Sequence, residues 1–152
     1  MTALWVKIKE KEKAAAGKPR GTSILDGVGN YLTALNRAEK LQKRVAKVGF
    51  DWSDQQGIIA KIEEELAEVK EAMAEGDESH VDEELGDLLF VVANLARFRK
   101  RATAEELLRA ANRKFETRFR HIERRLAEEE IPLAEAGSAR LEALWQEAKQ
   151  VE

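Results

Sequence analysis

Cysteine is absent from this chain of 152 residues, and proline and histidine occur only twice each. Without cysteine there are no disulfides, no thiolate nucleophile and no zinc–thiolate site. The two histidines, His80 and His121, have no His or Cys close by in the sequence. We therefore interpret both as ordinary surface or core residues rather than as metal ligands.

Long hydrophobic runs are also missing. No stretch approaches the roughly 18 apolar residues of a membrane span, and the N-terminus has no apolar signal-peptide region. There is no basic surplus, because 26 Lys and Arg stand against 29 Asp and Glu, whereas nucleic-acid binders are usually basic. We therefore expect a cytoplasmic protein that associates with neither membranes nor nucleic acids.

Helix-forming residues are abundant instead. Ala, Glu, Leu, Lys and Arg dominate, and runs of β-branched residues are few, which is typical of an all-α protein. The length suits one domain. We interpret residues 1–30 as an N-terminal segment and flexible linker, and residues 31–152 as a single helical domain.

Apolar periodicity and end signals predict the helices of that domain. The predicted ranges are 31–48, 54–75, 79–100, 103–130 and 138–151. The signals at their ends are Gly49 after the first, Ser53 or Asp54 before the second, a capping box from Thr103 to Glu106, and Ser138 before the last. Gly76 and Asp77 form a turn signal, so the second and third helices should form an antiparallel pair.

The same periodicity predicts which side chains face inward. In the first four helices these are Leu32, Leu35, Leu41, Val45 and Val48; Ile62, Leu66, Val69 and Met73; Val81, Leu85, Leu88, Leu89 and Val92; and Leu107, Ala111, Phe115, Phe119, Ile122 and Leu126. Gly86 would let the antiparallel pair approach closely. Phe50 and Trp52 are predicted to plug a core, and bordering a base pocket is the alternative for Trp52. Residues 88–93 are apolar on all sides, which indicates a short bundle completed by a second subunit.

Two pairs of carboxylates lie on the antiparallel pair. Glu65 and Glu68 share one helix face, as do Glu84 and Asp87, because residues three apart are neighbours on a helix. Both pairs flank the predicted apolar stripes, where they would be partly desolvated. Such a cluster repels itself unless it holds a cation, and its oxygen ligands favour Mg²⁺ or Mn²⁺, with Mg²⁺ also binding substrate phosphates. The alternative is that the pairs are chance features of charged, solvated helices.

The motif Glu64-Glu65-x-x-Glu68, followed by Glu84-x-x-Asp87, resembles the signature of the MazG nucleoside triphosphate pyrophosphohydrolases, within the all-α NTP pyrophosphatase superfamily. The resemblance extends to residues 48–52, 85–90 and 112–119 and covers nearly the whole chain. It is strongest to the C-terminal catalytic domain of two-domain bacterial MazG. The family implies dimers or tetramers of short bundles, so we expect a homodimer or a dimer of dimers.

The resemblance implies an enzyme that hydrolyses a nucleoside or deoxynucleoside triphosphate to the monophosphate and pyrophosphate. A metal-activated water would attack the α-phosphorus. The metal, Mg²⁺ with Mn²⁺ as a substitute, would be held by Glu65, Glu68, Glu84 and Asp87, and Glu64 would ligate a metal or orient water. The residues expected to contact the substrate are Lys9, Lys61, Asn94, Lys114, Arg118, Trp145 and Lys149.

Two other functions fit parts of the pattern. A helical, oligomeric binding or regulatory protein with a vestigial metal site is the alternative. A di-iron carboxylate bundle needs Glu-x-x-His pairs. Neither Glu65 nor Glu84 begins such a pair, so we exclude it. The sequence leaves the base and sugar preference open.

Overall fold

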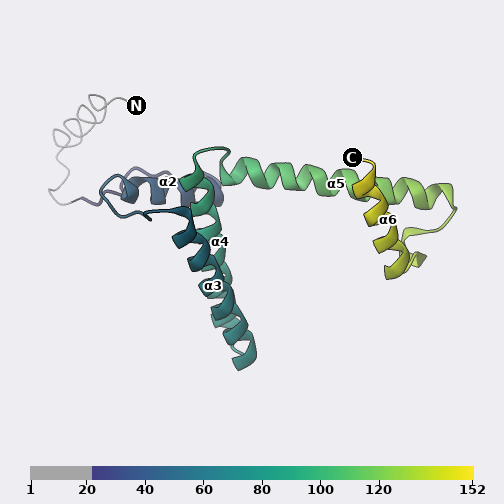
Figure 1. Cartoon of the computed structure of the whole chain (residues 1–152), viewed down its shortest axis with the longest axis horizontal. Coiled ribbons are helices and arrows are strands. Elements are labelled where there is room, and N and C mark those ends of the chain that lie inside the picture. The colour runs from purple at the N-terminus through teal and green to yellow at the C-terminus, as the bar shows by residue number, and fades with distance from the viewer. Residues whose placement is uncertain (1–21) are drawn as a thin grey trace. The chain divides into compact units, whose positions relative to one another are not determined.

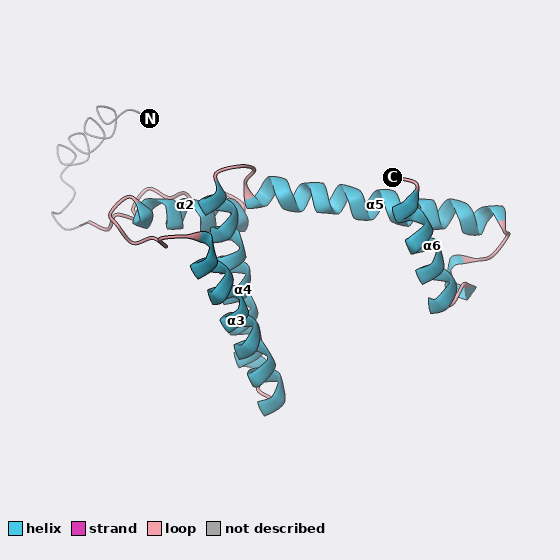
Figure 2. Ribbon diagram, in the orientation of Figure 1, coloured by secondary structure: helices cyan, strands magenta, loops and turns pink. Residues whose placement is uncertain are grey.

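The computed structural model describes residues 22–152, and its regular structure in this range is helical throughout (Figure 2). The elements are α2 (Ala34–Ala46), α3 (Gln55–Glu75), α4 (Glu78–Arg99), α5 (Ala104–Glu128), the short 3₁₀ helix η1 (Leu133–Glu135) and α6 (Ser138–Gln150). The predicted all-α class is therefore confirmed. Among these helices, none combines the length and the apolar character that a membrane crossing requires.

The described chain forms two compact units, which we call unit 1 (residues 22–101) and unit 2 (residues 102–152). Unit 1 holds α2, α3 and α4, and unit 2 holds α5 and α6. Lys9 and most of the predicted linker lie outside the described residues. The single domain over 31–152 stays a prediction.

Helices α3 and α4 run side by side in opposite directions, as predicted (Figure 1). Asp54 begins α3, because its carboxylate accepts a hydrogen bond from the Gly57 amide at 2.9 Å. Gly76 ends α3 at a φ of +71°, a conformation that costs glycine little. Asp77 then begins α4 by accepting a hydrogen bond from the His80 amide. Local capping chemistry thus builds the hairpin.

The contact between α3 and α4 differs from the predicted one. The buried residues of the pair are Ile58, Glu65, Val69 and Ala72 on α3, and Val81, Glu84, Val91, Ala93, Asn94 and Ala96 on α4. Leu66, Met73, Leu85, Leu89 and Val92, which were predicted to face inward, are exposed. Each helix carries apolar residues on more than one face, and periodicity does not show which face packs within the chain. Glu65 and Glu84 therefore lie in the seam between the helices rather than on its flank.

Gly86 does not lie where α3 and α4 approach each other, contrary to our expectation. It is exposed, and a Cβ atom added there would meet no atom within 4 Å in the described structure. The prediction was wrong because Gly86 lies away from the seam. The helices pack through Val69, Ala72 and Val81 instead.

Helix α2 packs against α4, and Gln42 is its buried residue. The helix ends at Ala46, with Lys47 as its cap and Gly49 two residues further at a φ of +92°. Gly49 thus marks the end of the helix, as predicted. Val48 was predicted to face inward but is exposed, because it lies beyond the last helical turn.

Unit 2 is a helical hairpin with a small core. The predicted capping box at Thr103 and Glu106 is present at the start of α5. Helix α6 packs on the C-terminal half of α5 through Ile122, Leu126 and Leu144. Leu107, Ala111 and Phe115, which were also predicted to face inward, are exposed, although the Phe115 ring lies 5.5 Å from the Trp145 ring on α6. Ser138 is not a cap: Gly137, at a φ of +79°, precedes α6 without a side-chain hydrogen bond.

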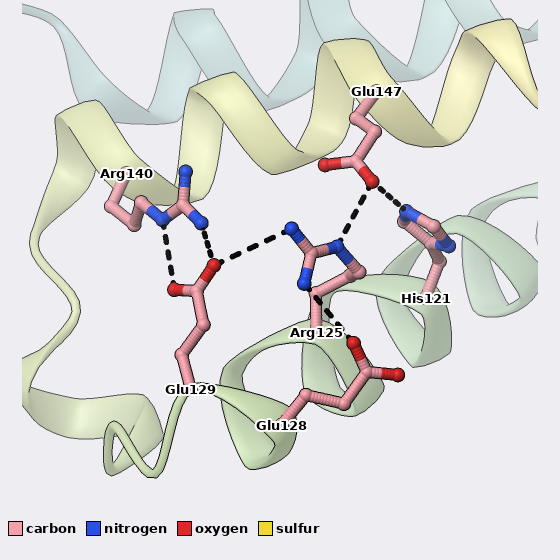
Figure 3. A network of polar contacts seen from close by, with 6 residues as sticks. All are labelled: His121, Arg125, Glu128, Glu129, Arg140 and Glu147. Atoms are coloured by element: carbon pink, nitrogen blue, oxygen red, sulfur yellow. Dashed lines mark hydrogen bonds and ion pairs between the residues drawn. The ribbon is translucent and has the colours of Figure 1, made fainter.

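A polar network joins the two helices of unit 2 (Figure 3). Arg125 contacts Glu128, Glu129 and Glu147, at 3.1, 3.4 and 3.0 Å. Arg140 binds Glu129 through two of its nitrogens. His121 lies 3.4 Å from Glu147, so it belongs to this network and not to a metal site.

Candidate metal and nucleotide site

Three carboxylates meet in the middle of the α3–α4 seam. Glu65 on α3 and Glu84 and Asp87 on α4 can each place one oxygen so that all three lie within 4.8 Å of one another. Glu65 is only 5% exposed and Glu84 only 9%, whereas Asp87 is exposed. The cluster therefore runs from a buried end to an open end.

The buried carboxylates are only half satisfied. Lys61 contacts Oε1 of Glu65 at 3.1 Å, and His80 Nε2 contacts Oε1 of Glu84 at 3.1 Å. The second oxygen of each, Oε2, is buried without a hydrogen-bond partner in residues 22–152. A buried carboxylate oxygen without a partner is costly. Because both free atoms are hard oxygen donors beside a third carboxylate, the set fits a divalent cation such as Mg²⁺ or Mn²⁺.

Lys61 gives the cluster a positive charge. Its Nζ also lies 3.2 Å from Glu64 Oε1, and the hydrogen bonds to Glu65 and Glu64 raise the pKa of Lys61. Burial raises the pKa of Glu65, but its contact with Lys61, together with the neighbouring Glu84, outweighs this effect, so the pKa of Glu65 lies below its usual value. Glu65 is therefore ionised at neutral pH and ready to hold a cation.

Glu68 lies against the same cluster from one turn further along α3. The neighbouring Glu84 carboxylate, burial, and the charges of Glu65 and Glu84 raise the pKa of Glu68 to about 7. A carboxyl group with a pKa near 7 is partly protonated at neutral pH, so the crowded cluster retains a proton in part of the molecules. A bound metal ion would compete with that proton.

Glu64 is exposed, and among the described residues its link to the cluster is its contact with Lys61. The structure thus brings together Glu65, Glu84 and Asp87, with Glu68 beside them. His80 was missed in the sequence, where we considered only His and Cys as its partners. Its spacing of four residues before Glu84 was the available signal, because such residues share a helix face.

A cavity of about 690 Å³ opens beside the carboxylates in unit 1. That volume is in the usual range for small-molecule pockets, roughly 300–1,000 Å³. Lys61, Glu65 and Asp87 line the cavity, as do Asn94 and Arg97, two and three turns further along α4. The cavity therefore connects the candidate metal site to a second polar region.

Aromatic side chains line the same cavity and correct one prediction. Phe50 is 78% exposed, and Trp52 is also exposed, so neither plugs a core within residues 22–152. Both line the cavity together with Phe90, which favours the alternative given for Trp52. The Trp52 ring lies over the first turn of α3, where a Cβ added to Gly57 would come within 3.0 Å of it.

An ion pair that the sequence did not suggest lies in the second polar region. Arg97 on α4 binds Asp51 at 2.5 Å and donates from Nε to Asn94 Oδ1 at 2.7 Å. The hydrogen bond from Arg97 lowers the pKa of Asp51. This pair ties the connector before α3 to α4, 46 residues further along the chain.

Four of the predicted substrate contacts gather in unit 2. Arg118 binds the Glu152 carboxylate at 2.5 and 2.8 Å, and its guanidinium lies 5.4 Å from the ring centre of Trp145. The hydrogen bond with Arg118 is the main cause of the lowered pKa of Glu152, and the charges of Lys114 and Lys149 add to it. Arg118 thus already binds one carboxylate, close enough to Lys114 and Lys149 for their charges to act on it, as a site for an anion would.

An antiparallel pair of helices with half-satisfied carboxylates in its seam and a cavity beside them defines the class: an all-α protein with a candidate divalent-metal site. Residues 53–123, which include α3 and α4, match the MazG nucleotide pyrophosphohydrolase domain. The chain is therefore similar to the MazG family over these residues, as its carboxylate motif predicted.

Curated relatives support the match over almost the whole chain. An Escherichia coli K12 protein named nucleoside triphosphate pyrophosphohydrolase is 40% identical over 99% of the chain and 56% of its own length. A Thermotoga maritima protein named nucleoside triphosphate pyrophosphohydrolase/pyrophosphatase MazG is 39% identical over 95% of the chain and 54% of its own length. The chain thus spans about half the length of these relatives.

Proposed function

We propose that this chain hydrolyses nucleoside triphosphates, ribo or deoxy, to monophosphates and pyrophosphate with Mg²⁺ as its cofactor and Mn²⁺ as a substitute. The observation that carries the proposal is the pair of buried, unpartnered oxygens on Glu65 and Glu84, next to a cavity of suitable size. The names of the E. coli and T. maritima relatives support it.

In this proposal, Glu65, Glu68, Glu84 and Asp87 hold the metal, and Glu64 ligates it or orients water through its place beside Lys61. When bound, Mg²⁺ supplies Lewis acidity, which lowers the pKa of water and offsets the negative charge of the phosphates. A water oxygen attacks the α-phosphorus, the bond to the bridging oxygen of the β-phosphate breaks, and pyrophosphate leaves with that oxygen. Lys61 stabilises the phosphates by its charge.

The remaining cations have supporting observations of their own. Lys114, Arg118 and Lys149 act together on the Glu152 carboxylate, and phosphate oxygens accept hydrogen bonds in the same way. We therefore keep Lys114, Arg118, Trp145 and Lys149 as proposed substrate contacts. Lys9 is proposed from the resemblance alone.

We also propose that the active form is a homodimer or a dimer of dimers. Leu85, Leu89 and Val92 form an exposed stripe on α4, and Leu66 and Met73 are exposed on α3. Contiguous apolar surface of this kind marks an interface in a soluble protein. Sedimentation analysis should find a dimer or larger species, and Leu89→Glu should shift it toward the monomer. A monomeric wild-type chain would contradict the proposal.

Product analysis with a panel of NTPs and dNTPs tests the reaction. Monophosphate and pyrophosphate, formed with Mg²⁺ or Mn²⁺ and lost with EDTA, would support it. Diphosphate and orthophosphate would overturn the point of attack. A chain that binds nucleotides but turns none over would favour the alternative, a regulatory protein with a vestigial metal site.

A further inference from the structure

Gln42 is a buried polar residue on α2, 8% exposed, that the proposed chemistry does not use. Its Nε2 donates to the carbonyl oxygens of Ala38 at 3.1 Å and Phe90 at 3.3 Å. A primary amide has two N–H donors and one carbonyl acceptor. These two contacts occupy both donors and fix the orientation of the amide, because a flip would place its oxygen against two carbonyl oxygens.

The carbonyl oxygen of Gln42, Oε1, is therefore the group left to meet a ligand. Gln42 lines the cavity that also contains Glu65 and Asp87. A ligand in this cavity thus meets a hydrogen-bond acceptor at Gln42 whose orientation is set before binding.

Asn94 has the opposite polarity. It is 7% exposed, lines the same cavity, and its Oδ1 accepts the hydrogen bond from Arg97 Nε. Because arginine only donates, the atom facing Arg97 must be the oxygen, which leaves the Nδ2 donor of Asn94 free to face a ligand. The ion pair with Asp51 holds Arg97 in place.

The acceptor and the donor lie close together. The Gln42 amide on α2 contacts the Phe90 carbonyl of α4, and Asn94 follows Phe90 by one helical turn, so the two amides lie near neighbouring turns of α4. Asp87 lies seven residues before Asn94, about 10 Å along the helix axis at 1.5 Å per residue. A nucleotide lying along α4 would thus have its phosphates at the carboxylates and its base near Gln42 and Asn94.

We infer that Gln42 and Asn94 read the edge of the nucleobase, with Gln42 accepting a hydrogen bond from a base N–H and Asn94 donating to a base oxygen or ring nitrogen. Nucleobase edges carry donors and acceptors side by side in this way. Phe50, Trp52 and Phe90 line the same cavity, and aromatic faces favour flat bases. The inference rests on the proposed function and adds Gln42 to it as a specificity-determining residue.

Gln42→Met tests this inference with little change in shape. The carbonyls of Ala38 and Phe90 keep their helical partners, so the variant should fold. We expect kcat/KM for the preferred triphosphate to fall about tenfold to a hundredfold, the range for one lost hydrogen bond in a buried site, and the spread of kcat/KM among bases to narrow. Gln56→Met, the same change at an exposed glutamine, should leave the ranking of bases unchanged.

Two outcomes of that comparison would overturn the inference. An equal loss of kcat/KM for every base would make Gln42 a structural residue only. A change in the ratio of ribo- to deoxynucleotides, without a change among bases, would place the sugar at Gln42 instead.

A ligand-side measurement keeps the inference testable if Gln42→Met does not fold. The wild-type chain is compared on the preferred triphosphate and on an analogue methylated at its edge N–H groups. We expect the wild type to disfavour the analogue at least about tenfold, the effect of one buried hydrogen bond. Where Gln42→Met folds, it should lose most of that discrimination. Equal use of both ligands by the wild type would overturn the inference.

Binding measurements separate this inference from the proposed function. If the wild type turns over no triphosphate, the proposed function fails. Nucleotide binding with Ca²⁺ is then measured by calorimetry. A base preference that Gln42→Met removes would still support the reading of the base, whereas no binding, or binding that ignores the base, would overturn it.

Discussion

Charged side chains are arranged in opposite ways in the two units. In unit 2, Arg125 forms ion pairs with Glu128, Glu129 and Glu147, as Figure 3 shows. Arg118 binds both oxygens of Glu152. In unit 1, Lys61 and His80 each satisfy one oxygen of a buried carboxylate and leave the other without a partner among the described residues. Carboxylates that bind arginine side chains support the fold, whereas a buried carboxylate oxygen without a partner shows where a ligand is needed.

The sharpest test of this comparison removes one carboxylate from each unit. Glu84→Gln takes away a buried metal ligand, so we expect activity to fall at least about 100-fold, the upper range for disturbing the surroundings of a metal site, with an unchanged helical circular dichroism spectrum. Asp87→Asn and Glu68→Gln should behave in the same way. Near-normal turnover in any of these variants would remove that residue from the site.

Glu147→Gln is the matched change in unit 2. It removes contacts of Arg125 and His121 that are partly exposed, so the loss should be below about 1 kcal/mol, and Tm should fall by no more than about 4 °C. Activity should stay within twofold of wild type (our order-of-magnitude expectation for a structural contact). A loss of activity as large as that of Glu84→Gln would erase the distinction between the two units.

His80→Ala should have the next largest effect. His80 holds one oxygen of Glu84 and leaves the other for a metal, so its loss should weaken metal binding about tenfold to a hundredfold. Titration with Mn²⁺, followed by paramagnetic resonance, measures this without turnover. His80→Gln, which can still donate a hydrogen bond, should restore part of the affinity. Unchanged Mn²⁺ affinity in His80→Ala would show that His80 has no part in metal binding.

Lys114→Ala should affect substrate use more than metal binding. We expect KM for the triphosphate to rise about fivefold to tenfold, the worth of one charge-assisted hydrogen bond of roughly 1 kcal/mol or more. Mn²⁺ affinity should not change. Normal kinetics would place Lys114 on the solvated face of α5.

The dependence of stability on pH should have opposite signs for Glu68 in unit 1 and for Glu147 and Glu152 in unit 2. The pKa of Glu68, about 7, lies above its unfolded value, so the folded metal-free chain binds more protons between about pH 4.5 and 7, and this carboxyl destabilises the fold as pH rises through that window. Glu147 and Glu152 have lowered pKa values in the folded chain. They therefore stabilise the fold when the pH is above their pKa values in the unfolded chain, and this stabilisation is lost as the pH falls through their pKa values in the folded chain. The free energy of unfolding, measured with urea from pH 3 to 8, should rise with pH at the acidic end and fall with pH as Glu68 ionises. Glu68→Gln should abolish only the fall.

The fold was predictable wherever the signal is local. Asp54, Gly76 and Thr103 act on atoms within a few residues, so the ends of the helices could be placed closely from the sequence. Facing directions were less predictable. Leu89 and Phe115 are apolar and periodic, yet exposed, because periodicity marks an apolar face without naming the surface that covers it.

The carboxylate motif and the resemblance to the MazG family follow from the sequence itself, since the spacing of Glu65, Glu68, Glu84 and Asp87 places them on facing turns of a helical hairpin. Only the tertiary structure decided that Glu65 and Glu84 lie in the seam with one free oxygen each. It also decided that Gln42 meets Phe90, 48 residues away. The physical reason is the same in both cases: burial and hydrogen bonding depend on which helix faces meet, and that choice is made by packing between distant segments.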